Sequence, residues 1–226
     1  MARFTAPITD ALATRNITTL YRLAIADGIV TGIGWYADAQ RIADALATRY
    51  GVTLAQAAGV IAATSPLNSW GANVNLAGRI LADHAEGITT TAGYLGTGLR
   101  KAAAILSGAD IPTTLNSPKI TNFWACIVSG GTDLDAVCID RHAWDIVTNT
   151  RHRDDAISGD ESLPVRPGIT GTRYAWAADG YRRAARILSR EMGRPVAASE
   201  VQAVTWIAWR RNYWAPGAFD GHALSA

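Results

Sequence analysis

The sequence predicts an all-α fold. Apolar residues recur at helical spacing over most of the chain, and glycine, proline or hydroxyl residues stand where such helices would begin and end. No stretch combines sustained period-two alternation with enrichment in β-branched residues, which is the pattern of a half-buried strand. No internal repeat or low-complexity segment interrupts this pattern. We therefore expect packed helices and no sheet.

Four helices are predicted in the N-terminal half, at residues 8–27, 35–50, 53–63 and 70–85. The second has the clearest amphipathic pattern and stops at Gly51. The third opens with Thr53-Leu-Ala-Gln56, in which a hydroxyl and an amide three residues apart can satisfy two free backbone donors as a capping box. Because that helix is apolar on nearly every side, we expect it to be central and buried.

The C-terminal half predicts helices at residues 99–106, 120–128, 139–148 and 174–192, and a last one starting at Ser199. Ser199-Glu-Val-Gln202 repeats the form of the capping box. A proline-containing hairpin at 115–119 precedes the second of these helices, and a Gly-Gly link follows it. The most polar segment, 149–172, predicts a long exposed loop.

Composition limits the function classes. A chain of 226 residues suits one domain or two small lobes, and its 49% hydrophobic and 18% charged residues indicate a soluble globular protein. Cys126 and Cys138 lie in apolar surroundings without metal-ligand spacing, which indicates buried thiols, a reducing compartment and no metal. We expect a cytoplasmic protein, in a bacterial or phage-infected cell, with no membrane partner and no cofactor. A formal charge of +2 permits DNA binding without demanding it.

Two residues carry the candidate chemistry. The chain has 21 Lys and Arg residues, yet only Lys101 and Lys119 are lysines, and Lys119 follows a proline turn before an apolar helix. A primary amine is a nucleophile only after losing its proton, which a partly desolvated site favours. Asp140 begins the helix after the Gly-Gly link and could stabilise positive charge on a sugar ring. Simpler interpretations stand beside these: Lys119 as a solvated charge, Asp140 as an N-cap and His142 as a packed helix residue.

These residues also carry a family resemblance. Leu115 to Asn122, followed 21 positions after Lys119 by Ile139-Asp140-Arg141-His142, resembles the helix-hairpin-helix DNA glycosylase superfamily. Its pattern is a Leu-Pro-Gly-x-Gly-x-Lys-Thr-Ala hairpin and then Val-Asp-x-His. The segment Thr64-Ser-Pro-Leu-Asn68 is similar to the family's DNA-facing Leu-Ser-x-Gln. The hairpin here lacks both glycines, and the family's four-cysteine motif is absent.

The resemblance implies one glycosylase-like unit over 1–226, with two helical lobes and a flipped nucleotide entering the cleft between them. The lobes would be about 53–148, and 1–52 with 173–226. Lys119 and Asp140 would occupy the catalytic positions. The residues expected to contact substrate or DNA are Ser65, Asn68, Trp70, Asn122, Arg141 and His142. Asn68 or Trp70 would fill the space left by the flipped base.

Three functions follow from this pattern. In the first, the protein excises a modified or damaged base, with Lys119 forming a Schiff base and cleaving the strand. In the second, it joins an amine to an activated 5-hydroxymethyl pyrimidine, as bacteriophage enzymes resembling thymine pyrophosphorylases are thought to do. In the third, it is a non-catalytic module that binds DNA or a protein. The target base and the oligomeric state do not follow from the sequence.

Overall fold

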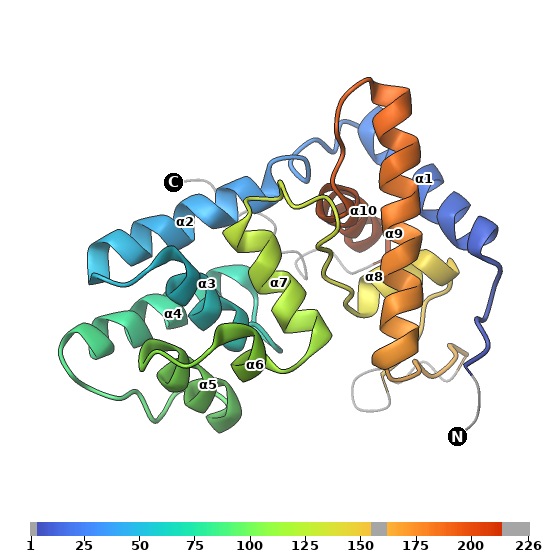
Figure 1. Ribbon diagram of the computed structural model, residues 1–226. Coiled ribbons are helices and arrows are strands. Elements are labelled where there is room, and N and C mark those ends of the chain that lie inside the picture. The colour runs from blue at the N-terminus through green and yellow to red at the C-terminus, as the bar shows by residue number, and fades with distance from the viewer. Residues whose placement is uncertain (1–3, 155–161, 214–226) are drawn as a thin grey trace. The chain divides into compact units, whose positions relative to one another are not determined.

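The computed structural model describes residues 4–154 and 162–213, and within these ranges it contains helices and no strand (Figure 1). The all-α prediction is confirmed. The helices are α1 (Asp10–Ala26), α2 (Trp35–Tyr50), α3 (Leu54–Ala63), α4 (Trp70–Ala85), α5 (Gly96–Leu106), α6 (Ile111–Leu115), α7 (Pro118–Val128), α8 (Arg141–Thr148), α9 (Gly171–Met192) and α10 (Ala198–Tyr213). Residues 155–161 of the predicted loop and 214–226 of the predicted second lobe lie outside the described ranges.

Local sequence signals place most helix ends correctly. The first capping box forms: the Thr53 hydroxyl accepts a hydrogen bond from the Gln56 amide nitrogen, and the Gln56 side-chain oxygen accepts one from the Thr53 nitrogen. Gly51, after α2, adopts a left-handed φ of 69° that few other residues tolerate. Both ends of this turn therefore follow from nearby residues alone.

The second predicted capping box does not form. Helix α10 begins at Ala198, so Ser199 lies inside its first turn, and its buried hydroxyl makes no hydrogen bond within the described residues. The short apolar run before it, Val196 to Ala198, is buried. Burial of that run starts the helix earlier than the capping signal indicates. The structure also adds α6, a five-residue helix in a segment predicted to be a linker.

The helices form two compact units. Unit 1 holds residues 4–34, 134–154 and 162–213, with α1, α8, α9 and α10; unit 2 holds residues 35–133, with α2 to α7. These units divide the chain differently from the predicted lobes at two places. Helix α2 packs on α3 in unit 2, and α8 packs with α1 and α10 in unit 1. As a result, Lys119 belongs to unit 2 and Asp140 to unit 1.

Unit 2 is built around α3, as its composition predicts. Residues 57–63 of this helix are all buried, and five of the seven are alanine or glycine, which lets neighbouring helices approach closely. A Cβ added at Gly59 would lie 3.2 Å from the Ile105 side chain of α5. Ile105 joins Leu115 and Ile120 in one buried cluster beneath the α6–α7 turn. The turn that carries Lys119 therefore rests on a rigid base.

Unit 1 packs around α10. The aromatic rings of Tyr21 from α1 and Tyr181 from α9 are fully buried, as is Val204 of α10. Gly32 passes so close to α10 that a Cβ there would lie 2.5 Å from the Val204 Cα. Cys126 and Cys138 are both buried thiols, as predicted. None of the described helices is long and apolar enough to cross a membrane.

Candidate functional site

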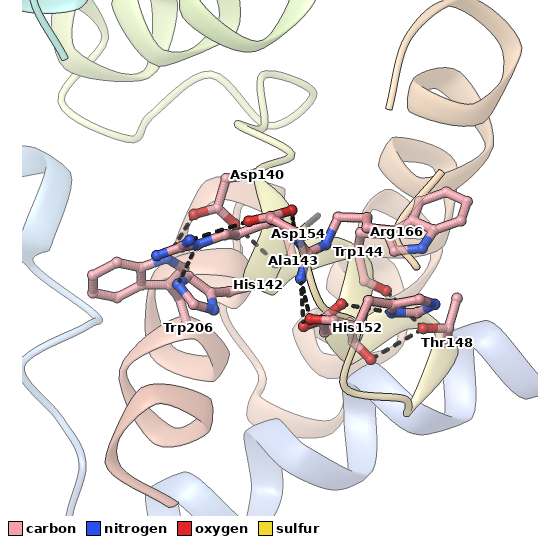
Figure 2. A network of polar contacts seen from close by, with 11 residues as sticks. Asp140, His142, Ala143, Trp144, Thr148, His152, Asp154, Arg166 and Trp206 are labelled. Atoms are coloured by element: carbon pink, nitrogen blue, oxygen red, sulfur yellow. Dashed lines mark hydrogen bonds and ion pairs between the residues drawn. The ribbon is translucent and has the colours of Figure 1, made fainter. Parts of the chain in front are cut away.

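Asp140 caps the N-terminus of α8, with extended backbone and both carboxylate oxygens bound. One oxygen accepts a 2.8 Å hydrogen bond from the Ala143 backbone nitrogen, and the other accepts a 2.8 Å bond from the indole nitrogen of Trp206 on α10 (Figure 2). The N-cap interpretation is thus confirmed. Such a cap contributes about 1 kcal/mol to stability. The second bond, from a residue 66 positions away, fixes the direction of the carboxylate.

His142 lies beneath this carboxylate and is only 4% exposed. Burial lowers the pKa of its ring to about 4; the charges of Arg141 and Arg210 add to this effect, while Asp140 opposes it. The ring is therefore neutral near pH 7. Its Nε2 accepts a 3.3 Å hydrogen bond from Arg141, and its edge faces Trp206 at 5.8 Å between centroids. Because the ring is buried, its exposure does not support the predicted role of His142 in contacting DNA.

Arg210 contacts the face of the Trp206 indole. Its guanidinium lies 4.7 Å from the centre of the Trp206 ring, in a cation-π geometry. The carboxylate of Asp140, the indole and this cation are therefore neighbours in one small region of unit 1. Of the predicted site residues, unit 1 holds Asp140, Arg141 and His142.

An ion-pair network holds the segment after α8 against that helix (Figure 2). Asp145 of α8 accepts a 3.3 Å hydrogen bond from Arg166 and contacts the His152 ring at 2.8 Å. Arg166 also binds Asp154 and donates a 2.7 Å bond to the His152 carbonyl. Asp154 in turn binds Arg141 at 3.3 Å. The described ends of the 149–172 segment are thus not uniformly exposed, since the Arg166 side chain is 8% exposed.

The two lysines of the chain have opposite surroundings. Lys101 donates hydrogen bonds of 2.6 Å to the Leu115 carbonyl and 2.9 Å to the Asn116 side chain, and burial lowers its pKa. It therefore closes the end of α6, where Asn116 is left-handed with φ 47°. Lys119 is the second residue of α7, half-buried, and makes no hydrogen bond or ion pair within the part of the chain that the structure describes.

Three other predicted contact residues use their side chains to bind backbone carbonyls three or four positions earlier in the chain. Asn122 donates a 2.8 Å bond to the Pro118 carbonyl, one turn earlier in α7. Ser65 donates to the Ala62 carbonyl at 2.9 Å, and Asn68 donates to Thr64 at 2.9 Å, so both stabilise the turn between α3 and α4. One exposed residue of that turn was not among the predicted contact residues.

Leu67 is that residue. Its side chain is 86% exposed, and its φ of 63° is left-handed, which is strained for a residue with a branched side chain. The turn therefore presents an apolar side chain to solvent at its tip. Sequence alone did not single it out, because an isolated leucine in a polar turn carries no periodic signal.

Trp70 belongs to an aromatic cluster in unit 2. Its ring centre lies 4.9 Å from that of Trp35 and 6.4 Å from that of Phe123. Tyr36 adds an edge contact to Trp35 at 4.8 Å. These contacts account for Trp70 as a packing residue, and its indole nitrogen is buried without a hydrogen bond in the described residues.

The described residues thus define an all-α protein in which unit 1 carries an anchored carboxylate at a helix N-terminus and unit 2 carries an uncommitted lysine at another. No group of three or more His, Cys, Asp or Glu side chains within these residues could hold a metal. The chain belongs to a family of unknown function, DUF7178, whose model matches residues 1–213. Comparisons with curated proteins and with solved structures found no match.

Proposed function

We propose that this protein acts on a base in DNA and excises it. The observation that carries the proposal is the Asp140 carboxylate, held in a fixed direction by the Ala143 amide and the Trp206 indole. As the bond between C1′ and the base breaks, the base leaves with the electron pair and positive charge grows on the sugar. A fixed carboxylate stabilises that charge without having to reorient during the reaction.

Lys119 supplies the second half of the proposal. Its amine, after losing a proton, attacks C1′ and forms a carbon–nitrogen bond. The C1′–O4′ bond of the sugar then breaks, O4′ takes the electron pair and a proton, and the resulting Schiff base permits strand cleavage by elimination. The amine suits this role because no described contact commits it to holding the fold, whereas Lys101 is committed to the end of α6. Of the two lysines in the chain, Lys119 is therefore the one whose amine makes no hydrogen bond or ion pair within the described residues.

The turn between α3 and α4 supports action on a stacked base. Extruding a base leaves a gap in the duplex, and an apolar side chain inserted there offsets part of the cost of unstacking. Leu67 offers such a side chain, strained and 86% exposed, beside the predicted wedge residue Asn68. Leu67 is therefore our preferred wedge over Trp70, which is packed among aromatic rings.

Borohydride trapping tests the proposal directly. Oligonucleotides carrying an abasic site, an oxidised base or a hydroxymethylated base would be incubated with the protein and reduced. We expect a covalent adduct that Lys119→Ala abolishes and Lys101→Met retains. Asp140→Asn should lose base release but still trap a preformed abasic site, because the bond that Asp140 helps to break is already broken there. An adduct that persists in Lys119→Ala would refute the role of that amine.

A second candidate is transfer of an amine to an activated 5-hydroxymethyl pyrimidine. The observation favouring it is the turn between α6 and α7, which uses left-handed Asn116 and Pro118 in place of the two glycines of a DNA-anchoring hairpin. The incoming nitrogen would bond to the methylene carbon and lose a proton as the activating group leaves with the electron pair of the broken bond. A mass gain on an intact strand, without base release, would select this reaction. Binding without either product would leave a DNA- or protein-binding module.

A further inference from the structure

Unit 1 carries a second feature, a groove between α1 and α9 with a volume of about 580 Å³. The two helices run side by side in the same direction, since Thr14 contacts Arg183 and Arg22 contacts Glu191 further along both helices (Figure 1). Five arginines line the groove: Arg15, Arg22, Arg183, Arg186 and Arg190. The only acidic residue in its lining is Asp10.

Two of these arginines join the two helices that line the groove, α1 and α9. Arg183 reaches from α9 to α1, where it donates a 3.1 Å hydrogen bond to the Thr14 hydroxyl and lies 3.5 Å from the Asp10 carboxylate. Arg22 reaches the other way and holds Glu191 through two bonds of 2.7 and 3.1 Å. These pairs clamp α1 to α9 and neutralise two of the five positive charges.

The positive charges of the other three arginines are not neutralised by an ion pair within the described residues. Arg15, Arg186 and Arg190 are exposed, and none of their guanidinium groups makes a hydrogen bond or an ion pair within the described residues. The pKa of the Glu191 carboxyl is lowered mainly by its hydrogen bond to Arg22, and the charge of Arg190 lowers it further. Like charges gathered along one groove repel one another, and this repulsion weakens when an anion lies between them.

The spacing suits an extended chain of phosphates. Arg186 and Arg190 are about one helical turn apart, which is about 6 Å along α9 at 1.5 Å per residue. A nucleic-acid strand carries one phosphate per about 3.4 Å of helix axis, so this length spans about two phosphates. Guanidinium groups bind phosphate oxygens through two parallel hydrogen bonds. A groove with exposed arginines along both walls fits a strand lying through it better than a ligand enclosed within it.

We propose that the groove between α1 and α9 binds the phosphate backbone of nucleic acid through Arg15, Arg186 and Arg190. This inference rests on the proposed function for its choice of DNA as the polyanion. The groove is formed by residues of α1 and α9, both in unit 1. The phosphate backbone bound there would be a contact with DNA in addition to those of Asp140 and Lys119. The groove fixes the strand without reading its sequence, because phosphate contacts carry no base information.

Equilibrium binding of the full chain to a labelled DNA duplex, measured over a range of salt concentrations, tests the inference. The variant Arg15→Gln/Arg186→Gln/Arg190→Gln should lower the slope of log affinity against log salt by about one per arginine. At about 0.1 M salt its affinity should fall on the order of 100-fold. Arg49→Gln and Arg151→Gln, which remove exposed arginines outside the groove, are the matched controls and should each leave the slope within experimental error.

Circular dichroism should show that the triple variant remains folded, since it spares both clamping arginines. An unchanged slope in that variant would overturn the inference, as would equal competition by free inorganic phosphate, which would indicate a site for a small anion. The outcome is separable from that of the proposed function. Salt-sensitive binding that is lost in the triple variant, without any trapped adduct or base release, would sustain the groove and refute excision. A Lys119-dependent adduct together with unchanged salt-sensitive binding in the triple variant would support excision and refute DNA binding in the groove.

Discussion

His142 makes the stability of the protein depend on acidity. Burial lowers the pKa of its ring from 6.5 to about 4, so the folded protein takes up this proton less readily than the unfolded chain. The stabilisation is fully present above pH 6.5 and is lost as the pH falls from 6.5 to about 4, the range in which the unfolded state binds the proton and the folded state mostly does not. The gap between the two pKa values corresponds to about 3 kcal/mol.

The perturbation is His142→Gln, which keeps a polar side chain of similar length but cannot gain a proton. Urea unfolding followed by fluorescence would give the free energy of unfolding near pH 7 and near pH 4.5. We expect the wild type to lose about 2 kcal/mol more than the variant between these values, since part of the full effect lies below pH 4.5. His84→Gln is the matched control, because His84 is exposed near the end of α4 and its removal should leave the wild-type acid sensitivity in place.

Equal acid sensitivity in His142→Gln and the wild type would refute this reasoning. It would mean that the loss of stability comes from other groups, such as the carboxylates of the network around Arg166. A proton-resolved titration of the His142 ring provides an independent check, since the ring should stay neutral down to about pH 4. A ring that titrates near 6.5 would show that it is solvated.

Two further changes test the packing. Gly32→Ala should destabilise the protein by about 1 to 3 kcal/mol, since the new Cβ would lie 2.5 Å from the Val204 Cα, whereas Gly34→Ala has nothing within 4 Å and should be neutral in thermal denaturation. An equal melting temperature for both variants would contradict this close contact. Lys101→Met should cost about 1 to 2 kcal/mol in urea unfolding, because it removes the bonds that close α6 at Asn116. An unchanged free energy of unfolding in Lys101→Met would show that the left-handed turn at Asn116 does not need the hydrogen bonds from Lys101.

The helices could be predicted because their signals are local. Thr53 and Gln56 satisfy each other's backbone across three residues, and Asp140 caps a helix by accepting from Ala143. Such contacts are specified by neighbours in the chain, so reading the sequence in order is enough to find them. Where burial competed with the local signal, as at Ser199, the prediction failed.

The sequence by itself therefore determined the all-α class, most helix ends and the presence of Lys119 and Asp140 near two of them. Only the tertiary structure decided that Trp206 fixes the Asp140 carboxylate, that α8 packs in unit 1, and that arginines from α1 and α9 line one groove. The physical reason is range. A backbone hydrogen bond within a helix joins residues four apart, whereas side chains 66 positions apart meet only after whole helices have buried their apolar faces.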